Sequence, residues 1–473
     1  MAREKKGKRL KRMKLEDNAE DIAYVELEND KNDEAIEEFT EDKTLSTTAD
    51  KIQDVQATHL PDELWHKIFS FLATPFVLKN FALVCQRFGK LSHDGYWMRS
   101  VSLNRNVVAR SCYDQVLEVL SKATCLQELK VPYFEETSEY NEIMRTVLQN
   151  SKTLKKLIIH STFFDGNFLQ CGTSLEHLGI EGPTFSEQAF GNIVQMKRLK
   201  SICLLLDDGR AFQGFRLEHL IAIANDFPNL ESIRINCIIF DVPELERSEA
   251  NIIFTSFYQR MANKLKCFDL NIKYRWVAFN HRDSVVLYEG IDSCELLEHL
   301  TVHSDLDTLT NAEWNSISKL PKLKCLKMTD HRQMVPARKL KTFFDALDIS
   351  EIIKLDVSDT KFSKITLNAI MKRGSFPKLE YLWLNHCEVG KDVEYMKKFI
   401  RTCPRLKFIS LEGVFTKVKL KDLRSLESAA SNRKLQINIG KYFVAEPGSD
   451  RDYLNQHYNR EVTETTLKSD CQH

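Results

Sequence analysis

The residues Pro377 to Cys387 read PKLEYLWLNHC, with leucine at positions 379, 382 and 384. Alternate side chains of a strand point to opposite faces, so this spacing predicts a turn that runs into a short strand with the leucines inward. Tyr381 and Trp383 then lie on the opposite face. Pro377 fixes its own φ and disfavours a helix before it, which marks where the extended segment starts.

The same pattern, leucine-x-x-apolar-x-apolar, recurs along most of the chain. It starts at Leu126, Leu154, Leu175, Leu199, Leu230, Leu265, Leu297, Leu323, Leu379 and Leu406, with looser versions at Met98 and Ile352. The average step from Met98 to Leu406 is 28 residues, within the roughly 20–29 residues typical of leucine-rich repeats. One such unit cannot bury its own apolar face, so the pattern predicts a stacked array with a continuous core.

The residues around each leucine strengthen this interpretation. The residue that follows the leucine is always Glu, Lys or Gln: Gln127, Lys155, Glu176, Lys200, Glu231, Lys266, Glu298, Lys324, Glu380 and Lys407. Proline stands two residues before four of the leucines, at Pro228, Pro321, Pro377 and Pro404. Helices are expected between the strands, for example over Leu217–Phe227 and Tyr395–Thr402. The steps that begin at Leu199, Leu230 and Leu265 are longer and predict insertions.

A different composition precedes the repeats, from residue 57 to residue 103, and predicts three short helices. Pro61 and Pro75 suit helix starts. Leu64, Ile68 and Leu72 recur every four residues and predict one apolar stripe on the first helix. The third helix is expected over Asn80–Leu91. A unit of this size has little core of its own, which predicts a binding partner.

This segment resembles an F-box. The resemblance is carried by Leu60-Pro61-Asp62-Glu63-Leu64, Ile68-Phe69-Ser70-Phe71-Leu72, Val84-Cys85-Gln86-Arg87-Phe88, Leu91, Asp94 and Trp97. The spacing is most similar to the F-box of the S-phase kinase-associated F-box protein, with Phe88 where the family usually has Trp. The resemblance implies a Skp-type adaptor and, through it, a cullin and a RING subunit as partners. The residues expected at the adaptor interface or directly beneath it are Leu60, Pro61, Ile68, Phe69, Leu72, Val84 and Cys85.

Three aromatic residues on neighbouring predicted strands, Tyr381, Trp383 and Phe408, face away from the core. Exposed aromatic side chains are typical binding anchors, so we expect them to contact a protein substrate. Lys327 and Lys354 lie one and two repeats away and favour an acidic or phosphorylated segment. The alternative is that the C-terminal tail folds over these rings with its own apolar residues Tyr442, Phe443 and Val444. Cys387 and Cys403 are expected to be buried as small hydrophobic residues.

The first 56 residues form two charge blocks, basic and then acidic, and are expected to be disordered. The basic run is either a solvated tail or a nuclear-localisation signal made by Lys5, Lys6, Lys8, Arg9, Lys11 and Arg12. Twelve cysteines without a C-x-x-C pair, and the lack of a signal peptide or a long apolar stretch, predict the nucleus or the cytoplasm and no membrane contact. Lys+Arg and Asp+Glu both total 67, so charge gives no general case for nucleic-acid binding.

The motifs of common catalytic and cofactor sites are missing from the sequence. It contains no phosphate-binding P-loop, no G-x-S-x-G elbow and no H-E-x-x-H helix. His299 and His303 share a predicted strand face without an evident third ligand, so no metal site is expected. These observations predict a protein without a cofactor that is not itself an enzyme.

The predicted fold is α/β: a curved leucine-rich-repeat solenoid with parallel strands on the concave face and helices on the convex face, preceded by a three-helix F-box. The expected boundaries are 1–56 for the tail, 57–103 for the F-box, 98–440 for about twelve repeats and 441–473 for the C-terminal tail. The resemblance implies the substrate-recognition subunit of a Skp-cullin-F-box ubiquitin ligase. Two alternatives remain: a scaffold or localisation factor outside a ligase, and a nuclear protein that binds nucleic acid through its basic tail.

Overall fold

The computed structural model places most of the chain from Leu60 to Ala445. It describes residues 60–69, 84–93, 98–102, 120, 123–134, 137–161, 164, 166–172, 174–182, 186–205, 216–240, 247–275, 287–303, 306, 309–329, 335–374, 376–387, 392–414, 417–418, 420–430, 434–440 and 444–445. The chain divides into two units, Met1–His59 and Leu60–His473, and every described residue belongs to the second. The predicted disordered tail lies outside the described residues.

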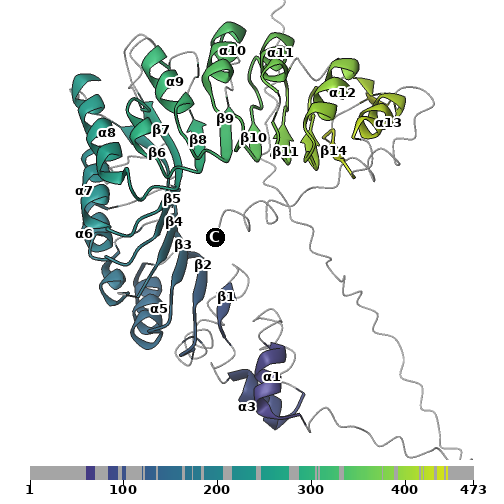
Figure 1. Cartoon of the computed structure of the whole chain (residues 1–473). Coiled ribbons are helices and arrows are strands. Elements are labelled where there is room, and N and C mark those ends of the chain that lie inside the picture. Colours follow the sequence, from purple (N-terminus) through teal and green to yellow (C-terminus); the bar gives the residue numbers. More distant parts are fainter. Residues whose placement is uncertain are drawn as a thin grey trace, which may run out of the picture. The chain divides into compact units, whose positions relative to one another are not determined.

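A parallel sheet of thirteen strands forms the second unit, and its strands follow one another in chain order (Figure 1). The strands are β1 Ser100–Ser102, β2 Glu128–Phe134, β3 Lys156–Ser161, β4 His177–Glu181, β5 Ser201–Leu205, β6 Ser232–Phe240, β7 Cys267–Arg275, β8 His299–His303, β9 Cys325–Thr329, β10 Lys354–Asp356, β11 Tyr381–Trp383, β12 Phe408–Ser410 and β14 Gln436–Asn438. A separate two-stranded parallel sheet pairs β13 Lys417–Val418 with β15 Val444–Ala445. This architecture is the predicted leucine-rich-repeat solenoid.

Two described helices, α1 and α3, precede β1, and the helices from α5 onward lie between strands along the outer side of the sheet (Figure 1). The helices are α1 Asp62–Phe69, α3 Gln86–His93, α5 Thr137–Asn150, η5 Asn167–Cys171, α6 Glu187–Ile193, α7 Glu218–Asp226, α8 Arg247–Met261, η6 Ile291–Ser293, α9 Asn311–Ser318, α10 Ala337–Ala346, α11 Lys364–Lys372, α12 Val393–Thr402 and α13 Leu420–Ala429. The helices expected over Leu217–Phe227 and Tyr395–Thr402 correspond to α7 and α12. A parallel strand pair needs such a crossover, which explains why a helix follows each strand of the large sheet from β2 to β11.

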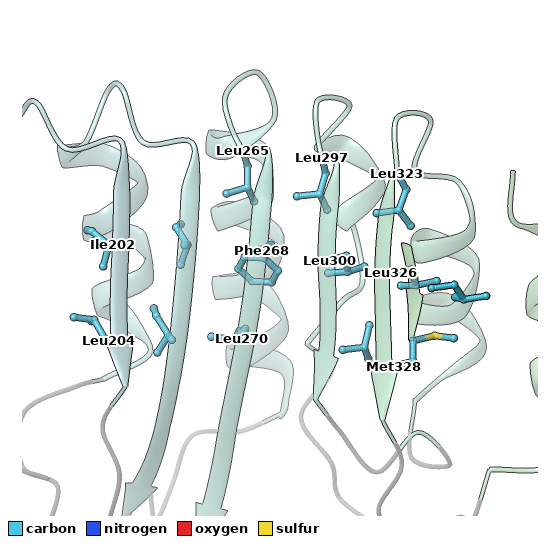
Figure 2. Packing of buried hydrophobic residues seen from close by; sticks show 14 of the residues in the cluster. Ile202, Leu204, Leu265, Phe268, Leu270, Leu297, Leu300, Leu323, Leu326 and Met328 are labelled. Carbon is cyan, nitrogen blue, oxygen red and sulfur yellow. The ribbon is translucent and has the colours of Figure 1, made fainter. Parts of the chain in front are cut away.

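The core lies between the sheet and its helices, and the repeat leucines build it. The ten leucines that start the predicted repeats are at most 1% exposed. Equivalent positions of adjacent strands pair directly, as Phe268 pairs with Leu300 and Leu300 with Leu326, and their side chains stack in rows (Figure 2). Cys387 and Cys403 are buried as predicted. Each repeat therefore completes the apolar layer of its neighbour.

Two of the three long central steps contain long strands, since β6 and β7 pair in register over nine residues from Ser232 to Phe240. The insertions expected in these steps fall on segments 206–215, 241–246 and 276–286, which lie outside the described residues. A thirteenth strand, β14, also follows Leu406, although no repeat start was assigned there. Its apolar residues, Leu435, Ile437 and Ile439, alternate and are all buried. Its first apolar residue, Leu435, stands one position later than the leucine that starts the other repeats, so this strand does not match the leucine-x-x-apolar-x-apolar pattern.

Candidate functional site

The two described helices of the F-box-resembling segment, α1 and α3, pack through three aromatic rings. Trp65 and Phe69 of α1 lie with ring centroids 4.4 Å and 6.2 Å from that of Phe88 on α3, and all three side chains are buried. Of the predicted apolar stripe, Ile68 is half-buried against the core and Leu64 is exposed, while Leu72 lies outside the described residues. In this short helix the Trp65 and Phe69 face meets Phe88, which leaves Leu64 47% exposed.

Arg87 fixes the start of α1 against α3. Its guanidinium donates from Nε to Asp62 Oδ1 at 3.0 Å and from Nη2 to the Leu60 carbonyl oxygen at 2.7 Å. The same Nη2 atom also contacts Asp62 Oδ1. This fork holds the carboxylate and the backbone together, because the guanidinium is planar and offers several donors at fixed angles. The third helix begins at Gln86 and not at Asn80 as predicted, with Val84 in a turn before it.

Three apolar side chains within or just before these two helices are exposed. Leu60, Leu64 and Val84 are 37%, 47% and 65% exposed. The other predicted interface residues take different positions: Pro61 is exposed, Ile68 and Cys85 are half-buried against the core, and Phe69 is fully buried. Leu72 lies outside the described residues. The exposed part of the predicted set is therefore Leu60, Pro61 and Val84, joined by Leu64, which belongs to the apolar stripe predicted for the first helix.

The three predicted substrate-binding aromatics do come together on the concave face. Tyr381 and Trp383 of β11 are stacked, with ring centroids 6.2 Å apart and planes at 17°. The Phe408 ring of β12 lies 5.4 Å from that of Trp383 and 6.4 Å from that of Tyr381. We call these three residues the aromatic cluster. Phe408 is only 4% exposed, so its expected exposure was wrong: it is packed beneath the rings of Tyr381 and Trp383, which remain half-buried.

The two predicted lysines beside the aromatic cluster both have contacts within the chain. Lys354 Nζ lies over the Tyr381 ring, 5.5 Å from its centroid. Lys327 Nζ lies 3.8 Å from Asp356 Oδ2. Asp356 and Trp383 are direct neighbours in the register of β10 and β11. The cluster therefore has both signs of charge at its border.

Of the tail residues that were expected to cover the cluster, only Val444 is described, and it pairs with Lys417 in the small second sheet. Tyr442 and Phe443 lie outside the described residues, as do Lys5, Lys6, Lys8, Arg9, Lys11 and Arg12. In the described part of the chain, no three His, Cys, Asp or Glu side chains are placed to hold a metal ion. No described helix combines the length and the apolar character of a membrane span.

Comparison with known proteins identifies the N-terminal part of the described chain. Residues 57–104 match the F-box-like family model, so the chain carries an F-box-like domain there. No curated protein gives a significant match.

Several solved structures are similar to the chain at low identity. The Rad7–Elc1 complex of yeast gives a TM-score of 0.48 at 15% identity, over 90% of this chain and 100% of that chain. An internalin, InlF, from Listeria monocytogenes gives 0.32 at 14%, over 70% and 77%. TLR13 in complex with ssRNA13 gives 0.36 at 15%, over 75% and 48%. All three TM-scores are below 0.5, so the fold assignment depends on the chain's own sheet and repeats.

Proposed function

We propose that the chain is the substrate-recognition subunit of a Skp-cullin-F-box ubiquitin ligase. The F-box-like domain binds a Skp-type adaptor, which brings the cullin and the RING subunit, and the concave face of the repeats holds a protein substrate. The chain then contributes no catalytic group. It raises the local concentration of a substrate lysine near the ubiquitin thioester, which accelerates transfer by proximity.

One observation carries this proposal: the exposed apolar side chains of the F-box-like domain. The described residues include five exposed large hydrophobic side chains. Three of them are Leu60, Leu64 and Val84, and the other two, Ile252 and Ile365, lie far along the chain. Burial of one such side chain in a partner interface contributes about 1.5–3 kcal/mol. Arg87 fixes Leu60 and α1 in place, so the surface is preorganised for docking.

The test is co-purification of the full chain with a Skp-type adaptor. The variant Leu64→Glu with Val84→Glu is expected to lose the adaptor by more than about 100-fold, because two carboxylates would be buried without partners. The control is Ile252→Glu with Ile365→Glu, which introduces the same charges at side chains that are 65% and 55% exposed on α8 and α11. Equal adaptor binding by both double variants would refute the adaptor interface.

The same preparation separates the ligase from the alternative. A ligase subunit retains the cullin and the RING subunit together with the adaptor, whereas a scaffold or localisation factor retains the adaptor alone. Nuclear localisation stays a prediction of the basic run at residues 3–14. Deleting that run from a fluorescent fusion is expected to remove the nuclear signal, and an unchanged distribution would reject it.

The aromatic cluster is the proposed substrate anchor. Trp383 is large, rigid and half-exposed, and its ring packs against those of Tyr381 and Phe408. Trp and Tyr are enriched among residues that dominate binding energy. Trp383→Ala is expected to weaken substrate binding at least about 10-fold without changing adaptor binding.

A further inference from the structure

We propose that Asp356 and Trp383 together bind an arginine side chain of the substrate segment. The guanidinium would stack on the indole and donate to the free side of the carboxylate. This inference rests on the proposed function, because it names the chemical class of the segment that the aromatic cluster receives.

The carboxylate of Asp356 has one oxygen in use and one available. Oδ1 accepts a hydrogen bond from the Ser358 backbone N–H at 3.0 Å. Oδ2 faces Lys327 Nζ at 3.8 Å, which is an ion pair but too long for a hydrogen bond. Among the described residues no donor lies within hydrogen-bond distance of this oxygen, although the side chain is only 19% exposed. A half-desolvated carboxylate oxygen gains most from an added charged donor.

The same concave row contains a second aspartate that shows how such a site is filled. Asp269 pairs in register with Arg234 on the preceding strand, as Asp356 pairs with Lys327. Arg234 Nε donates to Asp269 Oδ2 at 2.8 Å, while Lys327 stays 3.8 Å away. The chain thus supplies its own guanidinium to Asp269 and leaves Asp356 with a distant ammonium. The two sites differ in what occupies them.

The indole beside Asp356 supplies the other half of the site. Lys354 already lies over the neighbouring Tyr381 ring at 5.5 Å, so the aromatic cluster accepts a cation within the chain. Trp is the aromatic residue that attracts cations most strongly. Tyr381 and Phe408 support Trp383 from two sides. Arginine fits better than lysine, because a planar guanidinium can stack on a ring and still donate in its plane to a carboxylate.

An acidic or phosphorylated segment, which the two lysines favoured in the sequence, fits less well. Lys354 already lies over the Tyr381 ring, and the carboxylate of Asp356, 3.8 Å away, partly offsets the charge of Lys327. An incoming anion would meet the carboxylate of Asp356 directly beside the indole, and like charges repel in a partly desolvated site. The charges next to Trp383 therefore favour a cationic side chain.

The test uses the full chain bound to its adaptor and a displayed library of short random peptides. Peptides retained by the wild type and lost with Trp383→Ala are expected to be enriched in arginine. In a selected peptide, replacing that arginine with glutamine is expected to raise Kd on the order of 10-fold or more, and replacing it with lysine less. These peptide changes leave the protein unaltered, so misfolding cannot explain them.

Protein variants test the carboxylate directly. Asp356→Asn is expected to weaken the arginine peptide on the order of 10-fold, while Asp269→Asn, the matched control in the same row, leaves its Kd unchanged. Lys327→Ala is expected to leave binding equal or tighter, because it removes a competing cation. The inference is overturned if no peptide depends on Trp383, if the selected peptides are acidic, or if Asp356→Asn binds like the wild type. Adaptor co-purification of each variant is measured in parallel, so loss of the peptide alone rejects this inference and leaves the proposed function standing.

Discussion

The Nζ atom of Lys200 lies 2.7 Å from Oε2 of Glu176, and this contact joins the starts of two neighbouring strands. The other oxygen of the same carboxylate, Oε1, lies 3.5 Å from Lys155 on the opposite side. The backbones are linked in the same order, because Glu176 N–H donates to the Lys155 carbonyl oxygen and Lys200 N–H to that of Glu176. One carboxylate therefore connects three successive repeats.

The relationship repeats along the sheet edge as a ladder of alternating charge. Its members, in strand order, are Lys155, Glu176, Lys200, Glu231, Lys266, Glu298 and Lys324, and after Ile353 come Glu380 and Lys407. The pairs Lys266–Glu231, Lys324–Glu298 and Lys407–Glu380 close at 2.9, 2.8 and 2.7 Å. Parallel neighbours with opposite charges favour one register, since a slipped strand would move the opposite charges apart.

Reversing one charge of the ladder is expected to lower the stability of the protein more than removing that charge. Glu176→Gln is expected to lower the thermal midpoint by about 1–2 °C, and Glu176→Lys by more, because a third cation then stands between Lys155 and Lys200. The difference between the two variants should shrink in 1 M salt. Thermal unfolding at low and high salt measures it, and equal midpoints at low salt would contradict the ladder's role.

The pH dependence of this contribution has a definite sign. The hydrogen bond from Lys200, against an opposing effect of burial, lowers the pKa of Glu176. The stabilisation is therefore present above the unfolded pKa of about 4.3 and is lost as pH falls through the lower folded pKa. The deficit of Glu176→Gln against wild type should be full at pH 7, begin to shrink below the unfolded pKa of about 4.3, and vanish once the pH is below the lowered folded pKa.

The ladder also shows how much of the fold the sequence contained. The Glu, Lys and Gln residues after the leucines form a pattern in the sequence, because each of them stands directly before a strand and the strands pair in register. The burial of Phe408 was not visible, since it depends on Tyr381 and Trp383 of a different strand leaning over it. The buried face of α1 was equally hidden. In two helical turns, Leu64 and Trp65 are both plausible core residues until Phe88 selects one.

The fork made by Arg87 is expected to control adaptor binding. Arg87→Ala removes the contacts to Asp62 and to the Leu60 carbonyl oxygen and is expected to destabilise the F-box-like domain by about 1 kcal/mol, because the pair is partly exposed. Arg87→Lys should recover only part of this, since an ammonium cannot form the fork. Adaptor affinity and limited proteolysis after α1 are the measurements. Wild-type affinity in Arg87→Ala would show that α1 is fixed by other contacts.

The thiol of Cys387 is expected to be unreactive, and its ionisation is expected to affect stability only at alkaline pH. Burial raises its pKa to about 12, and Sγ donates to the Val357 carbonyl oxygen at 3.1 Å. An unfolded thiol loses its proton above about pH 8.5, so rising pH between 8.5 and 12 favours unfolding.

Cys387→Ala is therefore expected to be less stable than wild type by about 1 kcal/mol at neutral pH. Between neutral pH and about pH 10, wild type should lose up to about 2 kcal/mol that the variant does not lose, so the difference in stability narrows or reverses. Denaturant unfolding at both pH values measures this change. A maleimide reagent should label half-buried Cys125 well before Cys387. A difference that stays constant with pH would mean that the thiol is ionised or solvated in the folded protein.

A residue with left-handed backbone conformation follows each of the last four strands of the sheet, at equal spacing along the sequence. Of these residues, Gly413 is expected to tolerate no other side chain. Asp359, His386, Gly413 and Gly440 have φ of 59°, 58°, 67° and 77°. A Cβ atom on Gly413 would lie 1.9 Å from His386 Nδ1, so alanine there adds a clash to the left-handed strain.

Gly413→Ala is expected to cost about 1–2 kcal/mol for its φ and more for displacing the imidazole. Adding His386→Ala should recover only the second part, because the backbone strain remains. Gly191→Ala is the control: it lies in α6 with no atom near the new Cβ and should stabilise by about 0.5–1 kcal/mol. Urea unfolding of the four proteins separates the two costs. If Gly413→Ala unfolded with the wild type, the turn would tolerate a different φ, and the equal spacing of the four positions would not reflect a shared backbone requirement.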